Sequence, residues 1–169
     1  MFESDSELEE LQEILDSSMA GSGAHLRSIF KSEHRLTARQ VSHHLQGVVQ
    51  VAAATVNSRG EPLVAPIDAA LYRGKFHLST DVDSVRASHL RRQPAMSLTY
   101  FRGADPVIIV HGRAVLVQKD RPEFSALDSI WAKEYGKSIL ELSDTVFFIR
   151  VDPEKMFAFA FHPERFPTD

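Results

Sequence analysis

The feature that most limits the fold of this chain is a series of short apolar segments, many of them rich in β-branched residues, that turn sequences separate. The segments lie at 48–56, 62–72, 75–79, 95–102, 107–118, 145–151 and 155–161. Asn57-Ser58-Arg59-Gly60 and Arg73-Gly74 connect the first three, and such short connections favour antiparallel hairpins. The sequence therefore predicts about seven strands in a barrel or other α+β arrangement rather than alternating βαβ units.

The first part of the chain is predicted to be helical. Residues 7–17 place four apolar side chains on one helix face: Leu8, Leu11, Ile14 and Leu15. Gly21 and Gly23 break this helix, and Thr37 with Gln40 has the spacing of a capping box for the next one. We expect an N-terminal helical extension at 1–47 and a barrel domain at 48–169. The extension is interpreted as a dimer clasp or regulatory arm, or as a frayed tail.

Two further helices are predicted among the strands. The first covers 83–92, with Asp83 or Ser84 as its cap, and ends before Pro94. The second begins at Asp120-Arg121-Pro122-Glu123, where an Asp-x-x-Glu cap and a proline in the first turn indicate a helix start. It is expected to run to about Tyr135.

Composition excludes several classes of function. The 169 residues include no cysteine, so disulfides, iron–sulfur clusters and thiolate zinc sites are excluded. The net charge of −4 provides no basic field for nucleic acid. No apolar stretch approaches the roughly 18 residues of a membrane span, and the acidic N-terminus does not resemble a secretory signal. These features predict a cytoplasmic protein.

An ordered set of motifs between Val49 and Val117 indicates a family. In chain order, the motifs are Arg59-Gly-Glu-Pro62, Ala65-Pro66, Lys75 to Thr80, Asp83 to Leu90, Arg92 to Tyr100 and His111 to Leu116. In this order and spacing, the set resembles the split-barrel flavoproteins that include the pyridoxamine-5'-phosphate oxidases and the deazaflavin-dependent reductases. The resemblance implies a mainly β fold with flanking helices, a split β-barrel that binds FMN.

One group of residues has the chemistry of a phosphate site. Ser79 and Thr80 end a strand, and Ser84, Val85 and Arg86 begin a helix. Hydroxyls, the unpaired amides of a helix N-terminus and a guanidinium would then converge on one point, which is an arrangement that binds anions. The resemblance assigns the same residues to the cofactor phosphate.

The resemblance also implies where the cofactor ring lies. Backbone groups of Val64, Ala65, Pro66 and Ile67 are expected to face the reactive edge of the ring. Trp131 and Tyr135 are four residues apart and share a helix face. They are expected to pack in the core or at a dimer interface, or Trp131 contributes a wall over the cofactor from the partner subunit.

Two departures from the family pattern concern the enzyme for which it is named. Val85 stands where those oxidases often have a basic residue, which removes one charge from the phosphate site. His162 and Arg165 do not match the spacing of the C-terminal residues that hold the substrate phosphate in those oxidases. Pyridoxamine-phosphate oxidase activity is therefore not expected.

The resemblance implies an enzyme, an FMN-dependent oxidoreductase acting on an unidentified small organic substrate. It also implies a homodimer with cofactor sites at the subunit interface. One alternative is an F420-dependent reductase, for whose acidic tail Arg59, Arg91 and Arg92 are available. Others are a haem-binding or haem-degrading protein and a non-catalytic flavin-binding protein on the same barrel. No metal site is predicted, since the histidines lack ligand spacing, and the sequence assigns no catalytic side chain.

Overall fold

The computed structural model describes residues 2–168, which form six strands, six α-helices and two short 3-10 helices. The helices are α1 (Asp5–Ala20), α2 (Ala24–Ile29), α3 (Ala38–His44), α4 (Val85–Arg92), α5 (Pro122–Tyr135) and α6 (Ile139–Leu142), with η1 (Ser32–His34) and η2 (Pro163–Arg165). The strands are β1 (Val49–Val56), β2 (Pro62–Tyr72), β3 (Lys75–Asp81), β4 (Ala95–Phe101), β5 (Val107–Val117) and β6 (Val146–Phe159).

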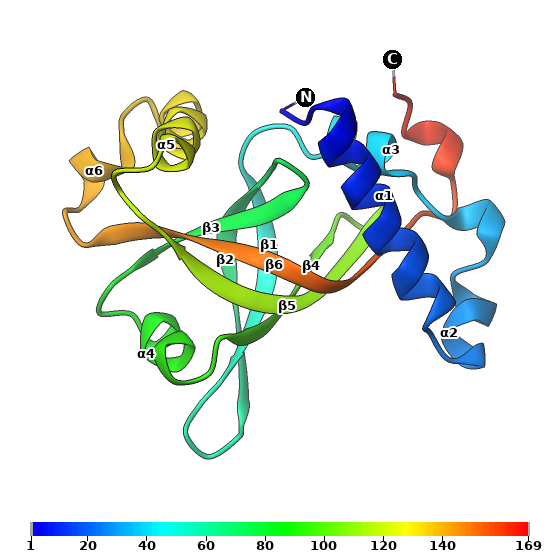
Figure 1. Ribbon diagram of the computed structural model, residues 1–169, viewed down its shortest axis with the longest axis horizontal. Helices are drawn as coiled ribbons and strands as arrows, with labels where there is room; N and C mark the ends of the chain where they lie inside the picture. The colour runs from blue at the N-terminus through cyan, green and yellow to red at the C-terminus, as the bar shows by residue number, and fades with distance from the viewer. Residues whose placement is uncertain (1, 169) are drawn as a thin grey trace.

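The strands form a closed antiparallel barrel in the order β1-β2-β3-β6-β5-β4 (Figure 1). Inward side chains fill it with one apolar core that includes Leu71, Leu78, Leu98, Ile108 and Val151. α1 and α3 lie at one end of the barrel, α4 at the other, and α5 on its outer side. The predicted barrel class is confirmed.

The structure corrects the number of strands from about seven to six. The segments predicted at 145–151 and 155–161 form one strand, β6, which continues through Asp152-Pro153-Glu154. β5 pairs with β6 along its whole length, with a register shift between His111 and Gly112. Proline cannot donate a ladder hydrogen bond, and a bulge is one of the few places in a sheet that tolerates it. The turn-like sequence is therefore a bulge.

The bulge requires a glycine at position 112. A side chain there would bring its Cβ to 3.0 Å from Pro153 Cα and into the carbonyl of Asp152. Both contacts are with backbone, which cannot move without displacing β6.

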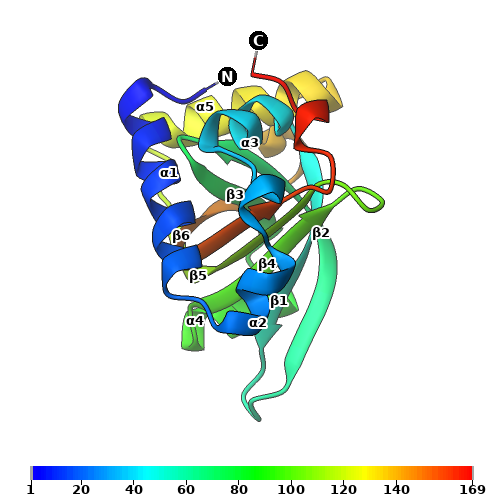
Figure 2. The ribbon, with the colours of Figure 1, turned by 90° about the vertical axis from the view of Figure 1, so that its right-hand side faces the viewer.

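The β1–β2 hairpin extends beyond the barrel (Figure 2). β2 pairs with β1 from Pro62 to Ala69, but its pairing with β3 begins only at Ala69. Within residues 2–168, the edge of β2 that faces β3 therefore has no strand partner from Pro62 to Asp68. This segment is an open edge where the hairpin extends beyond the closed barrel.

α1 packs along the barrel as part of its main core. Leu8, Leu11 and Leu15 are buried in the same apolar cluster as the barrel strands. Ser18 in the next turn accepts a hydrogen bond of 2.9 Å from the backbone N–H of Met156 in β6. The helix is longer than the predicted 7–17 and begins at a Ser4–Glu7 capping box. These contacts do not support a frayed tail, and the division at residue 47 stays a prediction.

α5 is held against the outside of the barrel by an apolar layer and a charged network. Its cap is Arg121, without a side-chain hydrogen bond, so the predicted Asp-x-x-Glu cap is wrong. Glu123 instead turns to the barrel, where its carboxylate lies 2.9 Å from His77 Nε2 and 3.4 Å from Arg150. His77 is fully buried, and its Nδ1 faces the carbonyl of Lys75 at 3.0 Å. The hydrogen bond from His77, aided by Arg150, lowers the pKa of Glu123.

We expect Gly112→Ala to lower the free energy of unfolding by about 2 kcal/mol or more, because the added methyl group overpacks backbone. Urea unfolding followed by circular dichroism measures the change. Gly23→Ala is the matched control, since a Cβ there meets nothing within 4 Å and its φ is −72°. Equal stabilities for the two variants would contradict this account of the bulge.

We expect Glu123→Gln to lower the free energy of unfolding at pH 7 by about 1–2 kcal/mol, because a charged hydrogen bond is lost. The folded protein holds the pKa of Glu123 below its ordinary value of 4.5. The carboxylate therefore contributes its full stability above that value, and the contribution is lost as the pH falls through the folded pKa.

Unfolding curves between pH 7 and pH 3 should show the Glu123→Gln and wild-type stabilities converging toward the acid end. Glu134→Gln, at an exposed position near the end of the same helix, is the control and should show no such convergence. A constant difference for Glu123→Gln would mean that its ionisation does not stabilise the fold.

Candidate functional site

The predicted phosphate residues meet where β3 ends and α4 begins. Ser84 caps α4 by accepting a hydrogen bond of 3.0 Å from the Ala87 N–H. The Oγ1 of Thr80, near the end of β3, lies 3.0 Å from the Oγ of Ser84. The first-turn amides of Val85 and Arg86 have no acceptor within a helix. The local structure thus presents unpaired donors at the end of the barrel.

Arg86 is a half-buried cation at this helix start. Among residues 2–168 its guanidinium has no carboxylate or other hydrogen-bond partner. Burial lowers its pKa, since the charged form is partly removed from water. A partly buried, unpaired charge is unfavourable by itself, and an anionic ligand would compensate for it.

A cavity of about 300 Å³ lies beside Arg86, between α4, β1 and β2. We call it the α4 cavity. Its lining residues are Ala53, Thr55, Leu63, Val64, Ala65, Ser84, Val85, Arg86 and His89. Apolar side chains thus form much of the wall, and the polar groups come mainly from α4.

The cavity brings together five of the residues that the sequence singled out. Val64 and Ala65 come from β2, and Ser84, Val85 and Arg86 from α4. The other strand residues lie next to these in sequence: Pro66 and Ile67 continue the open edge of β2, and Ser79 and Thr80 end β3. Thr80 is linked to the cavity through Ser84, whereas Ser79 pairs with Phe148.

Trp131 lies apart from this group. It is 2% exposed and packs on Phe148 with a centroid distance of 4.9 Å, in the apolar layer between α5 and β6. Its indole Nε1 has no hydrogen-bond partner among the described residues. It lines neither of the two cavities described here.

Thr55 and His89 also line the cavity, and the sequence analysis did not select them. Both are buried, and Thr55 Oγ1 lies 2.9 Å from His89 Nδ1. The sequence does contain one signal for His89. It is three residues after Arg86, so the two side chains lie on the same side of α4. Thr55 is 34 residues earlier in the chain, so only the fold reveals the pair.

A second missed contact anchors the open edge of β2. The Tyr135 hydroxyl, at the end of α5, donates a hydrogen bond of 2.6 Å to the Asp68 carboxylate. This bond, with burial and the nearby negative charge, raises the pKa of Tyr135 to about 12. The phenol is therefore a neutral donor at neutral pH, and it joins α5 to β2.

The other basic candidates are engaged elsewhere. Arg59 forms an ion pair of 2.7 Å with Glu61 beside the hairpin turn. Arg91 donates to the Val82 carbonyl, and Arg92 lies 3.4 Å from the Ser88 hydroxyl. Near the C-terminus, His162 pairs with Glu164 at 3.2 Å, and Arg165 lies in the short helix η2.

A larger cavity of about 520 Å³ lies between α4, β5 and β6. Of the residues that the sequence selected for a cofactor, it contains Arg91, a candidate for the acidic tail of F420. We call it the β5–β6 cavity. Within residues 2–168, the start of α4 and the half-buried Arg86 meet at the α4 cavity instead. No helix among residues 2–168 is long and apolar enough to cross a membrane.

Comparison with solved structures supports the fold. The conserved hypothetical protein Rv2991 from Mycobacterium tuberculosis aligns with a TM-score of 0.67 and 18% identity, over 82% of this chain and 93% of that one. HutZ, a haem storage protein from Vibrio cholerae, aligns with a TM-score of 0.58 and 16% identity, over 73% and 90%. An F420 reductase aligns with a TM-score of 0.54 and 16% identity, over 66% and 91%.

Comparison with models of protein families identifies the family of this chain. No curated protein sequence matches this chain significantly. The family model of pyridoxamine 5'-phosphate oxidase matches residues 37–164, which is more than half of the chain and includes every strand and the α4 cavity. Proteins of this family generally bind flavins or related cofactors and typically form dimers. With its closed six-stranded barrel and this match, the chain belongs to the pyridoxamine 5'-phosphate oxidase family of split β-barrel proteins.

Proposed function

We propose that this protein binds FMN in the α4 cavity and acts as a flavin-dependent oxidoreductase on a small organic substrate. The observation that carries the proposal is Arg86, a half-buried guanidinium without a partner among the described residues, at the first turn of α4. A phosphate monoester supplies the missing anion and accepts hydrogen bonds from the unpaired first-turn amides.

The residues around the cavity fit the rest of such a ligand. Arg86 and the start of α4 would hold the phosphate, while Leu63, Val64 and Val85 provide apolar surface for a ring and reduce its contact with water. When bound, FMN supplies hydride and electron transfer, and the protein supplies binding, orientation and electrostatics. Pro62 to Asp68 keep one free edge of backbone groups, to which a planar heterocycle can hydrogen-bond.

The residues around the α4 cavity favour FMN over the two other cofactors considered, F420 and haem. F420 carries a longer acidic tail, but Arg59 is paired with Glu61, and neither Arg91 nor Arg92 lines the α4 cavity. Haem needs an axial ligand, and His89, the histidine among the residues that line the α4 cavity, is only 5% exposed. Its bond to Thr55 through Nδ1 leaves Nε2 unengaged within residues 2–168, so the burial of the ring, rather than this bond, argues against haem. The Arg86 site matches a single phosphate more simply than either.

We expect Arg86→Ala to weaken FMN binding by about 1.5–3 kcal/mol, because a charged hydrogen bond to the phosphate is lost. Riboflavin has the same ring without the phosphate, so its affinity should change little. Fluorescence quenching titrations with both flavins measure the difference. Arg92→Ala, at an exposed cation in the last turn of α4, is the matched control and should bind FMN as the wild type does.

An equal loss of FMN and riboflavin binding would show that Arg86 supports the fold of the cavity rather than the phosphate. An unchanged FMN affinity would refute the placement of the phosphate. The absorbance spectrum of the purified protein tests the cofactor class itself: flavin bands support the proposal, and a Soret band contradicts it in favour of haem. Uptake of F420 without uptake of FMN would favour the deazaflavin alternative.

We further propose that the α4 cavity is completed by a second copy of the chain. Three large apolar side chains around it are exposed: Leu63 by 48%, Val64 by 69% and Val85 by 67%. Exposed apolar groups at the mouth of a cavity are typical of protein interfaces. Burial against a partner subunit would cover them and enclose the ring.

Light scattering coupled to size exclusion should give twice the chain mass of 19.0 kDa. Val64→Asp should shift the protein toward the monomer, because the interface would then bury an unpaired charge. Leu142→Asp, which changes a leucine that is 48% exposed at the end of α6, is the control and should stay dimeric. A monomeric wild type would remove the interface from the proposal.

A further inference from the structure

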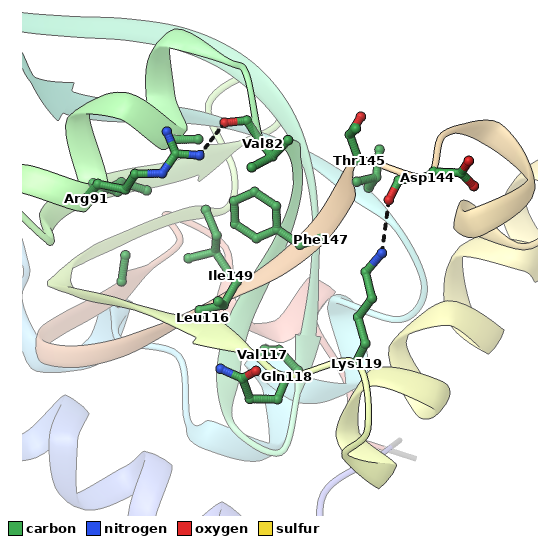
Figure 3. A pocket seen from close by; sticks show the side chains of 14 residues that line it. Val82, Arg91, Leu116, Val117, Gln118, Lys119, Asp144, Thr145, Phe147 and Ile149 are labelled. Carbon is green, nitrogen blue, oxygen red and sulfur yellow. Dashed lines mark hydrogen bonds between the residues drawn. The ribbon is translucent and has the colours of Figure 1, made fainter.

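The β5–β6 cavity has the size of a ligand site. Its volume of about 520 Å³ falls within the range of about 300–1,000 Å³ that is usual for small-molecule pockets. Its walls are a face of α4, the ends of β5 and β6 that meet there, and the segment before β6 (Figure 3). It is independent of the α4 cavity, because the two share no lining residue.

The floor of this cavity is apolar. Phe147 and Ile149 of β6 and Leu116 of β5 lie together at its centre (Figure 3). Leu116 is 51% exposed, so its side chain is accessible to a ligand. The facing positions on α4 and β5 hold small residues, Ala87 and Ala114, which leave the space above the floor unfilled. An apolar body is the ligand that would gain most from this surface.

Two cations stand at the rim of the floor. Arg91 donates to the Val82 carbonyl, and Lys119 donates to the Asp144 carbonyl at 3.0 Å. Neither cation is paired with a carboxylate within residues 2–168, and the Asp144 carboxylate points away from the cavity (Figure 3). An arginine has five N–H donors and a lysine three. Both side chains therefore keep donors for an anion.

From this combination we infer that the β5–β6 cavity binds a small organic anion with an apolar body, of the class of medium-chain or aryl carboxylates. The apolar part lies on Phe147 and Leu116, and the carboxylate lies at Arg91 or Lys119. The inference does not depend on FMN, since it uses a different face of α4 and other strands.

Direct binding of decanoate to the full-length protein tests the inference by isothermal titration calorimetry. Decanol and decylamine have the same chain with a neutral or a positive head. We expect decanoate to bind about fivefold more tightly than decanol, as one exposed cation would give, and decylamine to bind more weakly than decanol. Equal affinities for decanoate and decanol would overturn the charge assignment.

Variants locate the site. Arg91→Gln combined with Lys119→Gln should weaken decanoate about fivefold and leave decanol unchanged, since only the charges are removed. Arg92→Gln combined with Lys133→Gln, which removes two exposed cations of α4 and α5 that lie outside the cavity, is the matched control. Leu116→Asp should abolish binding of both ligands, and its exposure makes the substitution compatible with folding.

Two outcomes would overturn the inference. Decanoate binding that survives Leu116→Asp would place the ligand elsewhere. A protein that binds no decanoate, and whose dimer dissociates in Leu116→Asp, would show that a second copy of the chain covers the cavity. Flavin titrations of the Arg86 variant report on the other cavity, so a failure of one proposal is distinguishable from a failure of the other.

Discussion

β6 is hydrogen-bonded to β5 along most of its length and to β3 near its N-terminal end. Two layers outside the barrel depend on this pairing. α5 packs on Phe148 in the N-terminal part of β6, and α1 contacts the C-terminal part, where Ser18 bonds to Met156. A shift of one residue would turn every side chain of the strand to the opposite face. The bulge at Gly112 and Pro153 therefore fixes the register for both layers.

The open edge of β2 results from the way β3 pairs with its two neighbours, β2 and β6. β3 diverges from β2 after Leu78 and continues along β6 as far as Val146, so the segment from Pro62 to Asp68 loses its neighbour. The chain then leaves β3 and enters α4 at Ser84. The open edge of β2 and the start of α4 meet because β3 loses its β2 neighbour after Leu78 while it stays paired with β6. The Tyr135–Asp68 hydrogen bond holds this open edge from the side of α5.

The sequence predicted the features whose signals are local. Apolar, β-branched segments and turn residues located the strands, and the Ser84 cap and the Thr37–Gln40 capping box were confirmed. The bulge was missed because Asp152-Pro153-Glu154 has the composition of a turn, and only pairing with Gly112 makes it part of a strand. The predicted cap of α5 was wrong because the Glu123 carboxylate bonds to His77, 46 residues away in sequence, and does not cap the helix. The contact between Thr55 and His89 had no local signal either, because it depends on how α4 crosses the end of the barrel.

α4 is a helix of 8 residues that borders both cavities. Ser84, Val85, Arg86 and His89 face one of them, and Ala87, Leu90 and Arg91 face the other. A ligand that displaced one face of so short a helix would also displace the wall of the opposite cavity. Thermodynamic linkage then requires each ligand to change the affinity of the other by the same factor. Two chemically unrelated molecules that never touch would in this way compete or cooperate through a single two-turn helix.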